Sequence, residues 1–269
     1  MSRADTQTTI RFGEEIAKPV FAGTTAGHRF TFVGEGLFGT AFPIGGSRLI
    51  TAHHVVVSAL ASGGQLHIGW PEPDDRIVAG VPIPVAAATL VQQWPDVDLA
   101  AIEVSGADYS GADYKGGAWL TTEVAHILAT VTTAGYPFGY NAHEGSLTLR
   151  AFSGNVCSSC TSNLGRPGGP KTLIYELSFA APRGLSGAAL FDSAAAIAGC
   201  VVGNATTRML VYADEERLDE SGVKSRVERY EAMHLGIAIR SEAILNLAFR
   251  DGQTVREWVA GHGGTFKSY

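Results

Sequence analysis

Cysteine is scarce in this chain of 269 residues, which contains only three. An odd number of cysteines cannot all pair within one chain, and so few do not indicate a disulfide framework. Cys157 and Cys160 form a single CxxC motif, but a zinc site needs a second pair of ligands that the nearby sequence does not offer. We interpret these two as reduced thiols in a loop. Cys200 lies in the apolar run AGCVVG and is expected to be a small buried residue.

Long apolar runs and an excess of basic residues are absent as well. No stretch approaches the roughly twenty apolar residues of a membrane helix, and the first residues, MSRADTQTTIRFGEE, lack the apolar run of a signal peptide. If the natural chain begins here, we expect a cytoplasmic protein without membrane contact. The net charge is −6, with lysines and arginines scattered, so no basic stripe suggests binding to nucleic acid.

Short aliphatic runs separated by Gly, Pro, Asn and Asp are the main structural pattern. Examples are QLHIGW, HILATVTTAGYP, SLTLRAFSG and TLIYELSFA, in a chain with 33 glycines. Such runs at regular spacing predict antiparallel β-barrels. The predicted domains are an N-terminal extension (1–28), a first barrel with its linker (29–117), a second barrel (118–240), and a C-terminal helix and tail (241–269). The linker, Ser105–Gly117, reads SGADYSGADYKGG and is interpreted as an exposed connection.

Two further segments are interpreted by composition and periodicity. Ser241–Ala248 begins with a capping-type serine and has apolar residues at helical spacing, and Thr254–Ala260 is a second helical stretch. The charged block Asp214–Glu231 reads DEERLDESGVKSRVERYE and is interpreted as a solvated, partly helical surface insertion. The alternative is a loop over a substrate cleft that senses a partner.

Three separated segments contain the residues of a nucleophilic serine site. They read TAHHV (51–55), DVDLAA (96–101) and RGLSGA (183–188). A serine hydroxyl needs an imidazole to take its proton, and the imidazole needs a carboxylate to fix its tautomer. The order His, Asp, Ser differs from the orders in α/β-hydrolases and in subtilisins, and GLSGA does not match the hydrolase motif GxSxG.

These segments resemble the motifs of the chymotrypsin-type (trypsin-like) serine peptidases, in particular the bacterial type that lacks disulfides and an activation peptide. ITAHHVV resembles the TAAHC box, DLAAIEV resembles the DLALL-type strand and GLSGAALF resembles GxSGGPL. The resemblance covers roughly Thr31–Leu247. It implies a mostly β fold of two antiparallel six-stranded β-barrels, packed face to face with the active site between them, plus a C-terminal α-helix. It also implies His54 as base, Asp98 as acid and Ser186 as nucleophile, with no cofactor and no metal.

Each of the first two assignments has an alternative next to it in the sequence. Adjacent residues leaving a strand point in different directions, so only one of His53 and His54 can face the cleft. We assign His54 as the base and His53 as structural. Asp96 stands beside Pro95 in a polar turn, whereas Asp98 opens an apolar run that suits a buried, hydrogen-bonded carboxylate.

The resemblance also implies the groups that would hold the substrate. The backbone amides of Gly184 and Ser186 would form the oxyanion hole. The floor of the specificity pocket would lie near Ala180, and its walls would include three consecutive residues, Val202, Gly203 and Asn204. No acid lies between Leu177 and Leu190, so we predict small or medium apolar residues before the scissile bond. The alternative is that an acid of the charged block folds back into the pocket and selects Arg or Lys.

The function predicted from these residues is a serine endopeptidase that hydrolyses peptide bonds through an acyl-enzyme. Its partners would be a protein or peptide substrate and a regulatory protein, with no nucleic acid and no membrane. Two alternatives stay open: a catalytically weak or inactive trypsin-like module that acts in protein interaction, and an esterase on the same fold.

Overall fold

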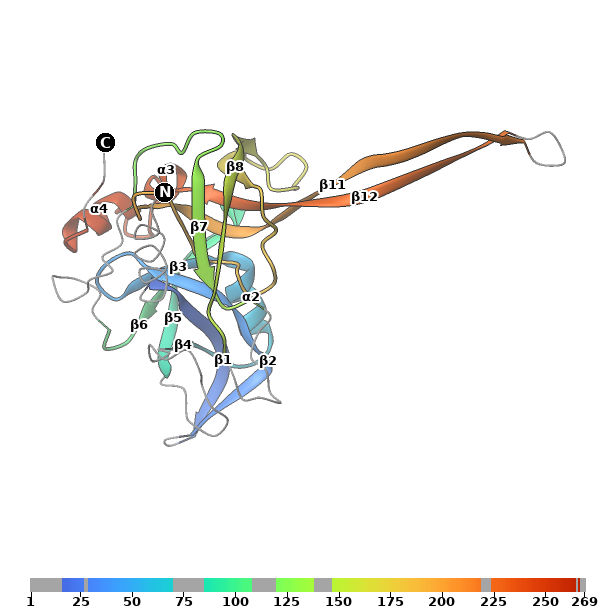
Figure 1. Ribbon diagram of the computed structural model, residues 1–269. Helices are drawn as coiled ribbons and strands as arrows, with labels where there is room; N and C mark the ends of the chain where they lie inside the picture. Colours follow the sequence, from blue (N-terminus) through green and yellow to red (C-terminus); the bar gives the residue numbers. More distant parts are fainter. Residues whose placement is uncertain are drawn as a thin grey trace.

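Two closed antiparallel β-barrels form the protein in the computed structural model (Figure 1). The structure describes residues 16–26, 29–69, 85–107, 120–137, 147–218, 224–264 and 266. Each barrel has six strands, and the helices are few and short. The predicted fold class is therefore confirmed.

The first barrel has the strand order β1-β2-β3-β6-β5-β4. Its central strands β3 and β6 are buried on both faces, as expected from their nearly uninterrupted apolar sequences, RLITA and LAAIEV. The helix α2 (His53–Ala61) follows β3 directly, and the short 3₁₀ helix η1 (Pro95–Val97) precedes β6. The strands of this barrel are β1 (Lys18–Ala26), β2 (Arg29–Pro43), β3 (Arg48–Ala52), β4 (Gln65–Gly69), β5 (Val85–Trp94) and β6 (Leu99–Val104).

The second barrel has the strand order β10-β11-β12-β9-β8-β7. Its strands are β7 (Thr130–Gly135), β8 (Arg150–Ser162), β9 (Thr172–Leu177), β10 (Ala189–Phe191), β11 (Ile197–Leu218) and β12 (Lys224–Arg240). One apolar cluster contains side chains of both barrels, among them Phe42 and Leu99 of the first and Ile174, Val202 and Ile237 of the second. This shared core fixes the two barrels against each other.

The first barrel begins earlier than the sequence indicated. β1 spans Lys18–Ala26 and pairs with both β2 and β4, so these residues close the barrel and are not part of an extension covering 1–28. Residues 1–15 lie outside the described residues, as does most of the predicted linker Ser105–Gly117. The pairing of β1 with β4 joins Val20 to Ile68, a contact that no local pattern in the sequence reveals.

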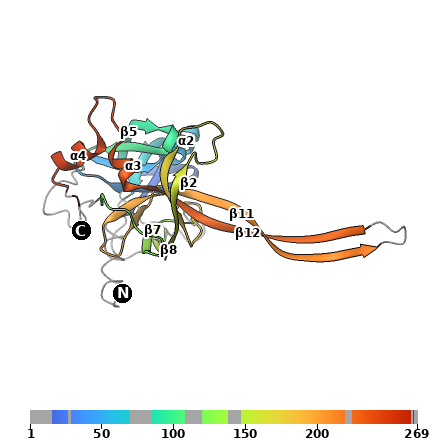
Figure 2. The ribbon, with the colours of Figure 1, turned by 90° about the horizontal axis from the view of Figure 1, so that it is seen from above.

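The charged block Asp214–Glu231 is part of a long two-stranded ribbon formed by β11 and β12. The ladder starts inside the barrel, where Cys200 pairs with Ile239, and continues to Leu218, which pairs with Lys224. The expectation of partial helix is wrong, because strand pairing that begins in the barrel is propagated outward and overrides a charge pattern compatible with a helix. Figures 1 and 2 show that the ribbon extends away from the barrels.

Two short helices follow the second barrel: the first contacts β9, β11 and β12, and the second contacts the β2–β3 turn of the first barrel through Trp258. The predicted helix at Ser241–Ala248 is α3 (Ser241–Leu245), and the predicted Thr254–Ala260 is α4 (Val255–Gly261) with Thr254 in a capping box with Glu257. Ser241 does not cap α3: it is the first helical residue, and its hydroxyl donates to the carbonyl of Thr121. Within the part of the chain that the structure describes, no helix is long and apolar enough to cross a membrane.

Candidate active site

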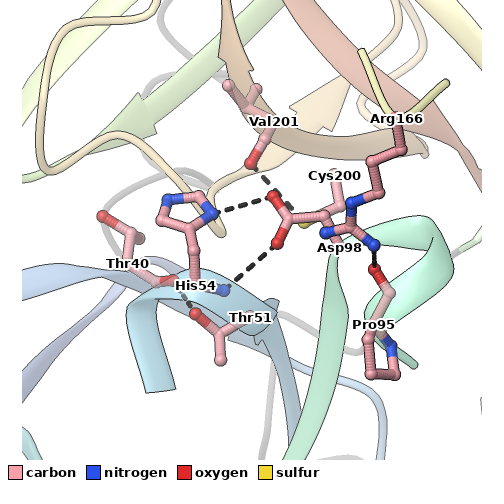
Figure 3. A network of polar contacts seen from close by, with 8 residues as sticks. All are labelled: Thr40, Thr51, His54, Pro95, Asp98, Arg166, Cys200 and Val201. Carbon is pink, nitrogen blue, oxygen red and sulfur yellow. Dashed lines mark hydrogen bonds and ion pairs between the residues drawn. The ribbon is translucent and has the colours of Figure 1, made fainter. Parts of the chain in front are cut away.

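His54 and Asp98 form a direct side-chain pair (Figure 3). The Nδ1 atom of His54 lies 2.8 Å from Oδ2 of Asp98, and the backbone N–H of His54 donates to Oδ1 at 3.1 Å. A carboxylate only accepts hydrogen bonds, so the proton of a neutral His54 ring is on Nδ1 and the Nε2 atom is free to accept another. The side chain of His54 is 47% exposed and that of Asp98 is 15% exposed.

The position of Asp98 explains how the first barrel creates this pair. Helix α2 begins without a side-chain cap of its own, and Asp98 satisfies its first amides instead: the backbone carbonyl accepts from His53 and the carboxylate accepts from His54. A negative charge at this end of a helix is also favourable. Asp98 has a left-handed backbone, with φ of 53°, a conformation that Asp tolerates better than most residues and that is common at functional sites.

The two neighbouring alternatives lie elsewhere. The Nε2 atom of His53 lies 3.0 Å from Oε1 of Gln93, so this ring is engaged on β5 and not with Asp98. Asp96 is exposed in the first turn of η1. The structure therefore brings together the two residues that the sequence analysis selected, while their catalytic roles stay predictions.

Ser186 lies in a turn whose shape depends on two glycines. Gly184 has a φ of 94°, and a Cβ atom there would clash with the carbonyl oxygen of Tyr136. Gly187 has a φ of 88°, and a Cβ atom there would clash with the carbonyl oxygen of Thr40. Only glycine combines a positive φ with such close backbone approach, which gives the pattern Gly-Leu-Ser-Gly a physical reason.

The backbone of Ser186 is attached to the barrel that holds His54. Its carbonyl oxygen accepts from the N–H of Thr40 on β2 at 2.9 Å. A Cβ atom on the neighbouring Gly39 would lie 2.8 Å from the same oxygen and would overlap Val55, the residue after His54. The backbone of Ser186 and the start of α2 therefore meet at Gly39, where no side chain separates them. Within the described residues, the Ser186 hydroxyl makes no hydrogen bond, either to His54 or to another group.

A threonine network sets the orientation of the turn before Ser186. The hydroxyl of Thr40 donates to the carbonyl of Gly184 at 2.8 Å and accepts from the N–H of Tyr136, and the hydroxyl of Thr51 donates to the carbonyl of Thr40. The N–H of Leu185 donates to the carbonyl of Pro182, which closes a β-turn. A positive φ at the third residue, Gly184, is typical of a type II turn.

This network leaves two amides unused. Within the described residues, the N–H groups of Gly184 and Ser186 donate no hydrogen bond. Gly184 is buried and Ser186 is half-buried, so both amides lie at the turn without an internal partner and can donate to a bound group. Thr40 was not identified from the sequence, although it directly precedes the buried run AFPI (41–44), because its role depends on a contact 144 residues away.

Among the residues predicted to form the specificity pocket, Asn204 has a side chain held by two hydrogen bonds. Its Oδ1 accepts from the N–H of Ala181 at 2.6 Å, and its Nδ2 donates to the carbonyl of Ala181 at 2.8 Å. This amide thus bridges β11 and the segment before the nucleophile turn. Ala180 is exposed and Val202 is buried. Gly203 faces open space, since a Cβ atom there would meet nothing within 4 Å.

Cys200 lies beneath the acid of the pair and is fully buried (Figure 3). Burial raises the pKa of the Cys200 thiol well above its usual range, and the nearby negative charge of Asp98 raises it further. The thiol therefore stays neutral next to the carboxylate. The prediction that Cys200 is a small buried residue is confirmed. Cys157 and Cys160 are both exposed free thiols on β8. Among the residues that the structure describes, no group of three or more potential ligands could hold a metal.

Comparison with known proteins gives a family and a fold. A family model described as a trypsin-like peptidase domain matches residues 39–203, more than half of the chain. No curated protein matches.

Three solved structures are similar in fold. The active form of the Rv3671c protease from M. tuberculosis has a TM-score of 0.55 and 16% identity, with 91% of this chain and 84% of that chain covered. Its inactive form has a TM-score of 0.53 and 17% identity, with 98% and 97% covered. The HtrA-type protease AlgW with a decapeptide has a TM-score of 0.58 and 16% identity, with 98% and 69% covered. At these identities the likeness concerns the fold, while the matched domain model fixes the family. The chain belongs to the family of trypsin-like peptidase domains.

Proposed function

We propose that this protein is a serine endopeptidase that cleaves peptide bonds through an acyl-enzyme. The observation that carries the proposal is the His54–Asp98 pair, which leaves Nε2 of His54 free on the barrel to which the Ser186 turn is attached. The matched peptidase domain supports the same reaction class.

The proposed reaction uses three groups in turn. The Ser186 hydroxyl attacks the substrate carbonyl carbon while its proton passes to Nε2 of His54, and the amides of Gly184 and Ser186 donate to the oxyanion that forms. As the C–N bond breaks, His54 returns the proton to the leaving amine, and an ester to Ser186 remains. Water then attacks the ester, His54 takes its proton and gives it back to Ser186, and the acid product leaves. Asp98 keeps the proton on Nδ1 and stabilises the charged ring.

An extended peptide can reach this site along an unpaired edge of β11. Strand β10 ends its pairing with β11 near Cys200, and Val201 makes the last hydrogen bonds on that side, to Ala188 and Gly187. Beyond Val201, β11 pairs only with β12 within the described residues. A peptide strand added to this edge would gain main-chain hydrogen bonds next to Ser186. The related fold of AlgW was solved with a decapeptide, which supports peptides as the substrate class.

The residue before the scissile bond is proposed to be small or medium-sized and apolar. The side chain of Asn204 spans the pocket wall to Ala181 and reduces the space for a long side chain. The ribbon that contains the acidic block extends away from the barrels, which disfavours an acid folding back to select Arg or Lys (Figure 2). Profiling the purified protein against a diverse peptide library tests this proposal. Predominant cleavage after Arg or Lys would disprove the apolar pocket, and hydrolysis of esters without peptides would favour the esterase.

The two adjacent histidines provide a test of the base. We expect His54→Ala to lower kcat/KM by about 10³-fold or more, because the serine proton then has no acceptor. His53→Ala is a matched control that removes the same ring one residue away and loses only the contact with Gln93, so a far smaller effect is expected. Steady-state kinetics on one peptide substrate measures both. Loss of activity in His53→Ala with activity kept in His54→Ala would reverse the assignment.

A further inference from the structure

A pocket lined by Asp98 also contains a carboxylate, Glu176, that the steps above do not use. It has a volume of about 370 Å³ and is open to solvent on one side. The three predicted walls of the specificity pocket, Val202, Gly203 and Asn204, line it on β11, but Ala180 and Ser186 do not. The pocket therefore extends from that wall towards β12 and β9. Its lining residues belong to the end of β8, the β8–β9 connection, β9, β11 and β12, and include Asp98. The ones that the argument uses are Leu164, Ile174, Glu176, Val202, Gly203 and Ile237.

Three of the lining residues form one row across neighbouring strands of the sheet. Gly203 on β11 pairs directly with Ile237 on β12, and Ile237 pairs directly with Glu176 on β9. Directly paired residues share one face of a sheet, so these three form a row that crosses three strands. Because Gly203 has no side chain and faces open space, the row is open at its β11 end. The row leads from the unpaired edge of β11 over Ile237 to the carboxylate.

Glu176 is the carboxylate of this pocket that has no partner among the described residues. Both carboxylate oxygens of Asp98 are engaged by His54, whereas Glu176 is half-buried and makes no hydrogen bond or ion pair with any residue that the structure describes. No Lys or Arg among the described residues lines the pocket. The nearest part of the β8–β9 connection carries Arg166, but its guanidinium donates to the carbonyl of Pro95 (Figure 3). The row from Gly203 over Ile237 thus forms an apolar trough that ends at the free carboxylate of Glu176. Such a trough suits a side chain with an aliphatic stem and a cationic head.

The distance from the edge of β11 to β9 determines how long such a side chain must be. Neighbouring strands lie about 4.8 Å apart, so a peptide added to the edge of β11 lies roughly 14 Å, or three spacings, from β9. Only a long side chain on the peptide, meeting Glu176 partway, covers that span. Because the residue before the scissile bond is placed against Val202, residues upstream of it continue along β11 towards Thr206 and pass the open end at Gly203.

We propose that this pocket is a second recognition site, which binds a Lys or Arg side chain of the substrate upstream of the scissile bond and pairs it with Glu176. This inference rests on the proposed peptidase function for the direction of the peptide. It gives the substrate class as peptides with an apolar residue at the cleaved position and a basic residue nearer the amino end.

Binding by the inactive Ser186→Ala protein tests the site without requiring turnover. Two fluorescent peptides are compared that differ only by Arg or Gln at one upstream position, with the position scanned along the peptide. We expect the Arg peptide to bind about tenfold more tightly at one position, and Glu176→Gln to remove that ratio, because the cation loses its charged partner. Glu231→Gln removes the same charge from an exposed site on β12 and should leave the ratio unchanged.

A second variant distinguishes a direct role of Glu176 from an effect of the Glu176→Gln substitution on folding. Gly203→Phe fills the open end of the trough without backbone strain, since Gly203 does not have a positive φ, and should also remove the ratio. Equal binding of the Arg and Gln peptides by the parent protein would overturn the proposal. So would a ratio that Arg166→Ala changes and Glu176→Gln does not, because Glu176 would then not be the group that recognises the cation. Failure of the peptidase function is seen separately, as absence of fluorophosphonate labelling in the protein with Ser186 intact.

Discussion

Replacing Ser186 with alanine is expected to abolish peptide hydrolysis and labelling by a fluorophosphonate, with a loss of rate on the order of 10⁶-fold. The hydroxyl makes no hydrogen bond within the described residues, and the turn is held by backbone contacts of Ser186 and by its flanking glycines. Removal of one oxygen should therefore leave the fold and the thermal unfolding temperature nearly unchanged. Single-turnover kinetics, labelling and thermal denaturation measure the three effects.

Ser58→Ala is a suitable control for this experiment. Ser58 is exposed on α2, close in sequence to His54 but outside the nucleophile turn. The variant should be labelled and should hydrolyse peptides like the parent protein. Labelling that persists in Ser186→Ala would mean that another residue is the nucleophile, and a parent protein that is never labelled would favour the inactive interaction module.

The fold and the site could be predicted from the sequence where local rules are strict. Gly184 and Gly187 are required by a positive φ and by close backbone approach, so the glycines around Ser186 have a local physical cause that the sequence displays. Asp98 could be separated from Asp96 because an apolar run after an acid indicates that the acid lies at a buried strand, and Asp98 does precede the fully buried start of β6.

Other features depend on contacts between distant segments, which no local pattern encodes. β1 closes the first barrel only because it finds β4, and its sequence, KPVFAGTTA, has no regular alternation. The ribbon of β11 and β12 is decided by a ladder that begins inside the second barrel. Thr40 and Asn204 act through contacts 144 and 23 residues away. The row from Gly203 to Glu176 can be recognised only when the register of three strands is known.

The second prediction with a large effect concerns the acid. Asp98→Asn is expected to lower kcat by about 10⁴-fold, as in the well-studied triad of this family. An Asn side chain can place its NH₂ group opposite Nδ1 of His54, which favours the ring with its proton on Nε2. That tautomer cannot take the proton of Ser186, so the nucleophile is present but not activated.

Asn is the informative replacement because the backbone of Asp98 has a φ of 53°, which Asn adopts readily while Ala would add strain. Asn can also accept from the N–H of His54, so the start of α2 should stay in place. The matched control is Asp96→Asn, in the exposed turn two residues earlier, which should be nearly silent. Kinetics with one peptide, together with the rate of fluorophosphonate labelling, measures both variants. Equal losses at Asp96 and Asp98 would leave the acid unassigned, and normal activity of Asp98→Asn would show that His54 needs no charged partner.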